Sequence, residues 1–252
     1  MAWRQGHPGQ TPASDIGEST LRGAVLESAL RREPARPERS AASPPRRTRS
    51  RAALIRAETP VEPSPRPEPP ETWCAEVFEL IEWRRFEHVV EALFAQAGFE
   101  TRTQPCGADG GVDIWLHSKN RRGTAVSIVQ CKHWNVWKVD VKRVRELRGV
   151  MAAHGIARGQ FVTTSRYTAE ARSFARDNGI MLHDTRSLLE LIASRDAKQQ
   201  QELLRVAFFG EYWKPTCANC GIKLVPRQAH DGGKPFWGCR HYPRCKTTLR
   251  MR

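Results

Sequence analysis

An acid, an amide and a lysine are expected close together within residues 106–134. Asp113 opens one short apolar segment, and Gln130 and Lys132 end a second one. The polar, turn-forming residues 118–123 between the two segments indicate a β-hairpin. Side chains alternate between the two faces of a strand, so Gln130 and Lys132 share one face.

The length of the predicted hairpin determines which residues face each other. A turn centred near Asn120 and Arg121 pairs Asp113 roughly with Ile128. Gln130 is then the diagonal neighbour of Asp113, within reach of a long side chain. We therefore expect the acid, the amide and the lysine to converge at one end of one sheet face.

These three side chains are suited to phosphodiester hydrolysis. Asp113 would bind Mg²⁺ or Mn²⁺, Gln130 would orient the metal or a water molecule, and Lys132 would stabilise charge on a scissile phosphate. A divalent cation can activate the attacking water and neutralise the leaving oxygen. One carboxylate is few for such a site, so Glu87 and Asp109 are candidates for a second and a third.

The alternative is that these residues belong to an ordinary sheet surface, which an isolated Asp…Gln-x-Lys pattern would favour. Two features argue for a site. Gly110 and Gly111 precede Asp113, and glycines permit close approach of a ligand to the backbone. The strand that ends in Gln130 is otherwise apolar, so polar side chains at its end stand out.

Helices and strands alternate around the hairpin. Residues 86–98 repeat apolar side chains at helical spacing, which predicts an amphipathic helix that carries Glu87 near its start and ends at Gly98. Further helices are expected at residues 73–83, 139–154, 168–178 and 199–209, with another after a cap at Asp184 or Thr185, and further strands at 99–103, 161–165 and 180–183. This order predicts an α/β fold with a mixed central sheet flanked by helices.

Two close pairs of cysteines near the C-terminus have the spacing of a zinc site. The expected ligands are Cys217, Cys220, Cys239 and Cys245. Each pair can occupy a turn, and the two pairs together supply a tetrahedral site for Zn²⁺. The basic segment 214–252 has little core of its own, so metal binding would supply its folding energy. A ligand set in which His241 or His230 replaces one thiolate is the alternative.

The charge of the chain favours a polyanionic partner, either nucleic acid or a membrane surface. The net charge is +14, and residues 214–252 hold nine basic residues and one acidic residue, whereas residues 71–213 hold 20 basic and 18 acidic residues. No segment approaches the ~18 apolar residues of a membrane span. The N-terminal residues lack the apolar core of a secretory signal, so we expect a cytoplasmic protein with no membrane association.

Three regions follow from this uneven composition. Residues 1–70 contain 12 of the 17 prolines and 12 arginines, and they lack the apolar side chains for a core, which predicts a disordered tail. Residues 71–213 are expected to form the α/β domain, and residues 214–252 a small zinc finger.

Short segments of the central region occur in a characteristic order. They are FEHVV at 86–90, GF at 98–99, DGGVD at 109–113, VQCK at 129–132 and VTTS at 162–165, followed by Ala169, Ala171, Phe174 and Ala175. Together they resemble the Mrr-like type IV restriction endonuclease domain, a branch of the PD-(D/E)xK nuclease superfamily. The resemblance covers roughly residues 83–195.

This resemblance implies metal-dependent cleavage of DNA, in restriction or in repair. It implies that Asp113 is the metal-binding acid, that Gln130 takes the place of the second acid, that Lys132 is the motif lysine and that Glu87 is the helix glutamate. Glutamine at this place, like Val112 in place of the usual proline, is typical of the Mrr branch. A nuclease-like fold that only binds DNA is the alternative. Cleavage of both strands would need two chains, as in a homodimer, or two binding events.

The C-terminal region has its own resemblance. Its segments CANCGIKLV (217–225), FWGC (236–239) and YPRC (242–245) are similar to the C4 zinc fingers at the C-terminus of bacterial type IA topoisomerases. This implies binding of DNA, in particular of single strands. Trp237 and Tyr242, with Phe236, could stack on bases while basic residues meet phosphates. Those basic residues are Arg240, Arg244 and Lys246, with Lys223 and Arg227. The alternative is that the aromatic rings form the small core of the finger.

Overall fold

The computed structural model describes residues 65–104, 111–119, 123–134, 137–229 and 233–251. All of them belong to one unit, Ala52–Arg252. Most of the expected tail, together with Asp109 and His230, lies outside the described residues. No helix in the described part of the chain is long and apolar enough to cross a membrane.

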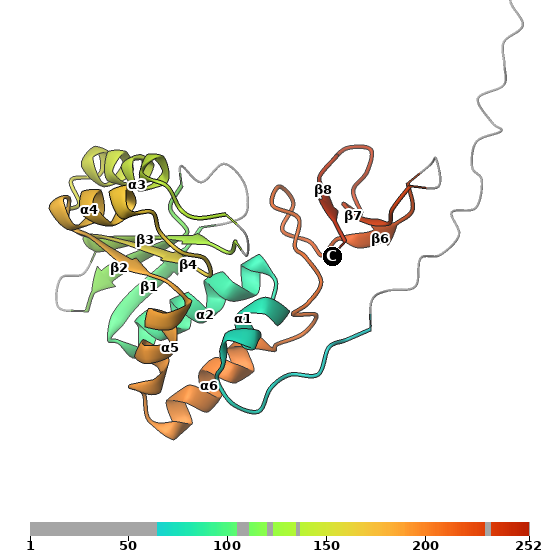
Figure 1. Cartoon of the computed structure of the whole chain (residues 1–252), viewed down its shortest axis with the longest axis horizontal. Helices are drawn as coiled ribbons and strands as arrows, with labels where there is room; N and C mark the ends of the chain where they lie inside the picture. The colour runs from blue at the N-terminus through green and yellow to red at the C-terminus, as the bar shows by residue number, and fades with distance from the viewer. Residues whose placement is uncertain (1–64, 105–110, 120–122, 135–136, 230–232, 252) are drawn as a thin grey trace, which may run out of the picture. The chain divides into compact units, whose positions relative to one another are not determined.

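A five-stranded mixed sheet forms the centre of the fold (Figure 1). Its order is β1 (Phe99–Thr103), β2 (Ile114–Ser118), β3 (Ala125–Lys132), β4 (Gly159–Thr163) and β5 (Ile180–His183). The first three strands pair antiparallel, and β3, β4 and β5 pair parallel. This is the mixed sheet that the sequence predicts.

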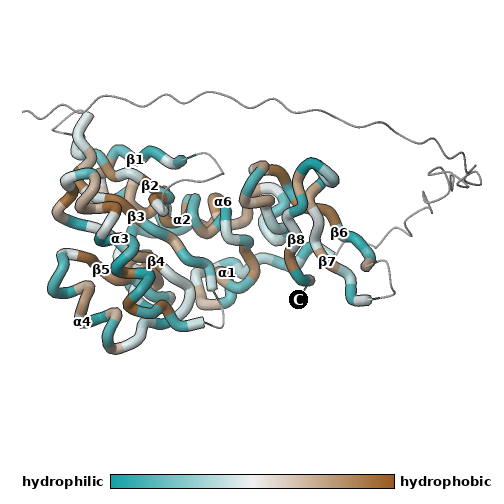
Figure 2. Tube along the Cα trace, turned by 90° about the horizontal axis from the view of Figure 1, so that it is seen from above, coloured by the Kyte–Doolittle hydropathy of each residue, from teal (hydrophilic) through white to brown (hydrophobic). Residues whose placement is uncertain are grey.

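Six helices in the described residues cover both faces of this sheet. They are α1 (Ala75–Leu80), α2 (Trp83–Gln96), α3 (Val141–Ala153), α4 (Ala169–Asp177), α5 (Thr185–Ala193) and α6 (Ala197–Ala207). One apolar cluster joins the sheet to α1, α2, α5 and α6, and a second joins it to α3 and α4. Figure 2 shows hydrophobic and hydrophilic segments alternating along the helices, as expected for elements with one buried face.

The hairpin register differs from the expected one by two residues. Ile114 pairs with Val129 and Trp115 with Ile128, so Asp113 does not pair with Ile128 as predicted. A register shift also occurs between Leu116 and His117. Because the difference from the prediction is even, it does not change which side chains share a face.

Helix α2 begins three residues earlier than its apolar repeat indicates. The side chain of Glu82 caps it by accepting hydrogen bonds from the backbone N–H groups of Arg84 and Arg85. Its buried stripe packs on the sheet, and the helix is followed by Gly98 at a φ of 94°. The expected helix at 73–83 is shorter, Ala75–Leu80, because the chain becomes extended at Ile81.

The C-terminal region forms a separate three-stranded antiparallel sheet. Its strands are β6 (Val225–Arg227), β7 (Phe236–Gly238) and β8 (Thr248–Arg250). Its small core consists of Leu224, Trp237 and three of the cysteines. The cysteines are therefore part of the core that holds this sheet to its loops.

Candidate functional site

Asp113 lies directly before β2, with its carboxylate fastened to the end of β3. Its backbone N–H donates to the carbonyl of Val129 at 3.0 Å. Its Oδ2 accepts a hydrogen bond from the backbone N–H of Cys131 at 2.6 Å. Cys131 stands between Gln130 and Lys132, so the strand end that carries the amide and the lysine also positions the acid.

The Gln130 side chain is buried, and part of its polar surface is unused. Only 6% of the residue is exposed, and its Oε1 has no hydrogen-bond partner in the described part of the chain. Gly111 adopts a φ of 85°, and a Cβ on it would lie 3.3 Å from Nε2 of Gln130. Glycine is thus required here by the close approach of the amide, and the amide oxygen is available to a metal ion or its water.

Glu87 supplies a second carboxylate from the start of α2. The residue is 7% exposed, and its Oε2 forms an ion pair of 2.7 Å with Nη1 of Arg84. Burial, reinforced by the charge of Asp113, raises the pKa of Glu87 to about 8, while Arg84 and Lys132 act in the opposite direction. Burial is thus the main cause, and Asp113 and Lys132 are near enough to Glu87 to contribute with opposite signs.

Lys132 is the last residue of β3, and its backbone is fixed to the neighbouring strand. Its carbonyl accepts from the Thr163 hydroxyl at 2.7 Å and from the Thr164 N–H at 3.3 Å. The side chain is half-buried. The backbone bonds hold the origin of this flexible side chain at the same sheet end as Asp113.

The donor set fits a hard divalent cation. Two carboxylates and an amide oxygen without a partner are oxygen ligands of the kind that Mg²⁺ and Mn²⁺ prefer, with water filling the remaining positions. Asp113 and Glu87 would hold the ion, and Gln130 would contact it or its water. Arg84 is the neighbour that the sequence analysis missed, although its i, i+3 spacing from Glu87 was a usable signal.

The four expected cysteines converge in the C-terminal region. Their sulfur atoms all lie within 4.8 Å of one another. Cys217 and Cys245 are 3.7 Å apart at Sγ, and Cys220 and Cys239 are 3.9 Å apart. A tetrahedral site with Zn–S bonds of about 2.3 Å has edges of about 3.8 Å, so these distances fit zinc. The exposed His241 donates its backbone N–H to Cys239 Sγ at 3.4 Å, a role that needs no imidazole ligand.

The residues expected to contact DNA fall into two groups. Arg240, Arg244 and Lys246 are exposed, and 62% of Tyr242 is exposed. Trp237, in contrast, is only 6% exposed and packs in the core of the finger. The expectation that Trp237 stacks on bases is therefore corrected, because a buried ring offers no free face.

Lys223 is also engaged elsewhere than expected. Its Nζ lies 3.1 Å from Oε1 of Glu82, the cap of α2. Glu82 also accepts hydrogen bonds from the N–H and the hydroxyl of Thr216, each at 3.1 Å. Trp83 donates its indole N–H to the Thr216 carbonyl at 2.8 Å. We call these four residues the Glu82 joint, and it connects the C-terminal region to the helix of Glu87.

Comparison with known proteins supports a restriction-endonuclease-like domain. Residues 78–192 match a family model, Mrr_cat, described as a restriction endonuclease. The chain is 32% identical over 128 residues to the type IV methyl-directed restriction enzyme EcoKMrr of Escherichia coli K12, covering 48% of this chain and 41% of that enzyme. It is 31% identical over 97 residues to the uncharacterized protein y4cE of Sinorhizobium fredii, covering 38% of this chain and 25% of the relative. The chain thus spans less than half of each relative.

Solved structures with a similar fold share little sequence with this chain. MspJI restriction endonuclease in complex with a 27-mer oligonucleotide is 17% identical with a TM-score of 0.39, covering 52% of this chain and 33% of that one. The modification-dependent restriction endonuclease AspBHI is 20% identical with a TM-score of 0.40, covering 52% and 38%. AF1548, a protein of unknown function, is 21% identical with a TM-score of 0.37, covering 50% and 79%.

Proposed function

We propose that this protein is a metal-dependent DNA endonuclease of the restriction or repair type. The observation that carries the proposal is that the Asp113 carboxylate is bound at the strand end of Gln130 and Lys132 and interacts with the buried Glu87 carboxyl. The Gln130 amide oxygen there has no hydrogen-bond partner among the described residues. The family match at residues 78–192 supports the same reaction.

The proposed reaction is hydrolysis of one phosphodiester bond. A bound Mg²⁺ or Mn²⁺ supplies Lewis acidity and lowers the pKa of a bound water. Asp113 and Glu87 hold the ion, Gln130 orients water, and Lys132 offsets the charge that develops on the phosphate oxygens. Water oxygen forms the new bond to phosphorus as the bond to one ester oxygen breaks. That oxygen leaves with a proton from solvent, and the attacking water gives up one proton to solvent.

We further propose that the C-terminal region is a zinc finger that binds DNA. The spacing of its four sulfur atoms fits Zn²⁺, and the exposed side chains of Arg240, Tyr242, Arg244 and Lys246 suit phosphates and bases. With one nuclease site per chain, cleavage of both strands would need two chains, as in a homodimer, or two successive binding events.

One observation favours a second candidate, a DNA-binding protein that does not cleave. Arg84 forms an ion pair of 2.7 Å with the carboxylate of Glu87. If a cation cannot displace Arg84, Asp113 is left as the main acidic ligand, and one carboxylate binds Mg²⁺ weakly.

Supercoiled plasmid incubated with Mg²⁺ or Mn²⁺ distinguishes the two candidates. The nuclease predicts nicked or linear DNA with the native protein and none after EDTA is added. Lys132→Ala should reduce the rate at least ~100-fold, as expected for loss of charge stabilisation, whereas the exposed Lys198→Ala on α6 should cut normally. Unchanged cleavage by Lys132→Ala would refute the assigned site. A gel shift without cleavage would support the second candidate.

A further inference from the structure

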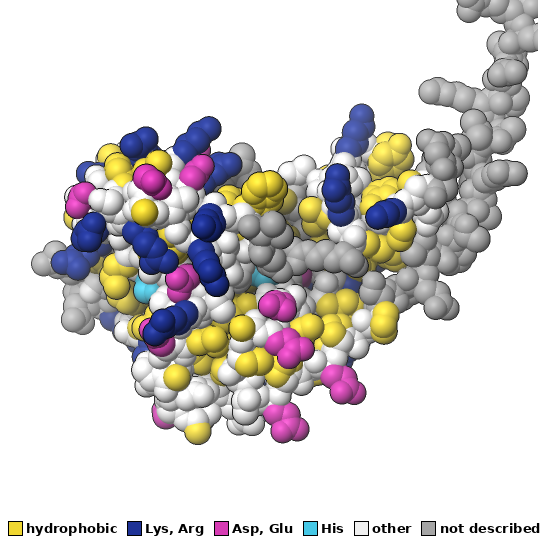
Figure 3. Space-filling view, in the orientation of Figure 1, with side chains coloured by type: hydrophobic (Ala, Val, Ile, Leu, Met, Phe, Trp, Pro, Cys, Tyr) yellow, Lys and Arg dark blue, Asp and Glu magenta, His cyan; other side chains and the backbone are white. Residues whose placement is uncertain are grey.

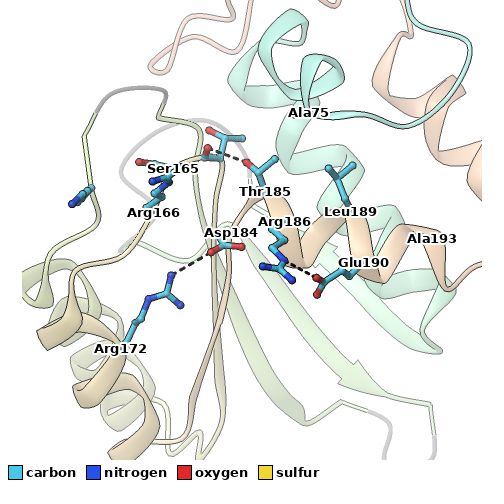
Figure 4. A pocket seen from close by; sticks show the side chains of 12 residues that line it. Ala75, Ser165, Arg166, Arg172, Asp184, Thr185, Arg186, Leu189, Glu190 and Ala193 are labelled. Carbon is cyan, nitrogen blue, oxygen red and sulfur yellow. Dashed lines mark hydrogen bonds and ion pairs between the residues drawn. The ribbon is translucent and has the colours of Figure 1, made fainter.

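A large open hollow lies beside the carboxyl ends of β4 and β5 (Figure 4). Its volume is about 1070 Å³. Four basic residues line it: Lys138, Arg166 and Arg172 near α4, and Arg186 on α5. Leu189 of α5 adds an apolar surface to the same lining. Figure 4 shows Arg166 and Arg172 on one side of the hollow and Arg186 on the other.

The charge of the hollow is positive. Arg172 pairs with Asp184 at 3.3 Å, and Arg186 pairs with Glu190 at 2.9 Å. Lys138 and Arg166 are exposed and form no ion pair within the described residues. The lining therefore presents four cations against two carboxylates, which is an anion-binding balance.

This concentration of charge is not a property of the whole domain. Residues 71–213 are nearly balanced, with 20 basic and 18 acidic residues. Figure 3 shows most of the Lys and Arg side chains of this face over α3 and α4, with some Asp and Glu among them, and further Asp and Glu side chains over α1 and α6. On this face the basic side chains therefore gather on the part of the domain that includes α4.

The sheet links the backbone of the candidate nuclease site to the hollow. Lys132 pairs with Thr163 across β3 and β4. The next residue, Thr164, donates its N–H to the Lys132 carbonyl and also lines the hollow. The strand end that carries Lys132 is therefore hydrogen-bonded to a residue of the hollow's lining.

We propose that this hollow holds the phosphate backbone of the DNA strand that flanks the scissile phosphate. The proposal rests on the proposed nuclease function and names where that substrate lies. Surface ion pairs such as those of Arg172 and Arg186 contribute little to stability, so phosphates can replace their carboxylates. Arginine binds phosphate oxygens with two parallel hydrogen bonds, and Leu189 packs against sugars.

The exposure of the four cations favours a polymer over a small anion. A site for a free phosphate or nucleotide encloses its ligand with a few buried polar groups. Here Lys138, Arg166, Arg172 and Arg186 are all exposed. Cations spread around an open hollow instead suit successive charges along one strand.

The test is duplex binding by Lys138→Ala/Arg166→Ala without divalent metal. A labelled duplex of about 25 base pairs is titrated over a range of salt concentrations, so cleavage plays no part. We expect binding at least ~10-fold weaker near 0.1 M salt, equally for unrelated sequences, and a salt slope smaller by about 2. Lys198→Ala/Arg205→Ala on α6 removes the same charge from exposed positions and should leave binding near native.

Native-like binding by the hollow variant, or an equal loss in the control variant, would overturn the proposal. A plasmid-cleavage assay on the same proteins distinguishes a wrong proposal for the hollow from a wrong assignment of the nuclease site. If the native protein cuts and the hollow variant binds and cuts normally, only the hollow is wrong. If nothing cuts but only the hollow variant loses binding, the hollow stands and the nuclease assignment fails.

Inorganic phosphate tests whether the hollow binds a small free anion instead of the phosphates of DNA. If millimolar phosphate raises the melting temperature of the native protein but not of the hollow variant, at matched ionic strength and with unchanged DNA binding, the hollow is a small-anion site. That result overturns the proposal. No phosphate effect together with weakened DNA binding supports it.

Discussion

Glutamine at position 130 determines how the candidate site is charged. A buried amide would add an oxygen ligand but no negative charge, so in the proposed site Asp113 and Glu87 would have to neutralise the cation. Without metal, burial disfavours the charged form of Glu87, and the nearby carboxylate of Asp113 adds to this. The pKa of Glu87, raised to about 8, is the result of that arrangement.

Glu87→Gln should stabilise the metal-free protein at high pH and abolish cleavage. The folded protein holds a proton on Glu87 up to about pH 8, whereas the unfolded chain loses it near 4.5. Since the folded state binds more protons between these values, this carboxyl lowers stability as pH rises from about 4.5 to 8. In EDTA at pH 8.5 we expect the variant to be more stable by at least ~1 kcal/mol.

Thermal unfolding at pH 5 and pH 8.5 measures this difference. The native protein and the variant should converge at pH 5, where Gln and protonated Glu are nearly equivalent. A variant less stable than the native protein at pH 8.5 would show that burial of the Glu87 carboxylate does not destabilise the fold. A variant that still cleaves plasmid would show that Glu87 is not a required metal ligand.

The elements of this fold are largely predictable, because each depends on local pattern. The apolar repeat of α2 and the five strands of the mixed sheet are confirmed. The register of the hairpin is not predictable in this way, since it depends on the irregularity between Leu116 and His117. The start of α2 also escaped prediction, because its cap, Glu82, is held by residues more than 130 positions away.

At the candidate site, residue types were predictable but burial was not. The convergence of Asp113, Gln130 and Lys132 follows from strand alternation. The burial of Trp237 and the pairing of Lys223 with Glu82 follow from tertiary packing, which no local pattern reports. Both residues were therefore assigned to DNA from their residue types and from the resemblance of the C-terminal region to C4 zinc fingers.

Lys223→Met tests whether the Glu82 joint supports helix α2. The change keeps the aliphatic stem but leaves one oxygen of the buried Glu82 with fewer donors. Loss of such a partner costs about 1–3 kcal/mol. We expect that loss in urea denaturation, with faster hydrogen exchange in the first turn of α2. Lys246→Met, an exposed lysine of the same finger, is the control. Equal effects of the two changes would contradict the joint.

At the scale of the whole molecule, the C-terminal region carries more than half of the net positive charge, +8 of +14. Residues 214–252 hold nine basic residues and one acidic residue. Removing the region would also take Thr216 and Lys223 away from Glu82. A truncation could therefore not distinguish the loss of positive charge from the loss of hydrogen bonds to the cap of α2. Surface substitutions separate the two.

The variant Arg240→Ala/Arg244→Ala/Lys246→Ala should weaken DNA binding without unfolding the finger. Its three side chains are exposed, so the four sulfur ligands should still hold about one zinc ion per chain, as metal analysis can verify. The salt slope of binding should fall by up to about 3. An unchanged slope with zinc retained would show that the DNA contacts lie elsewhere.

The Glu82 joint bears on how such a chain can change by recombination. A break between residues 213 and 214 follows the visible boundary of the two sheets, yet it separates a buried carboxylate from the groups that solvate it. The C-terminal region is consequently not an independent module that can be exchanged on its own. A fusion that joins residues 71–213 to another C-terminal module must also provide new donors for Glu82, or the buried cap of α2 will lack hydrogen-bond partners.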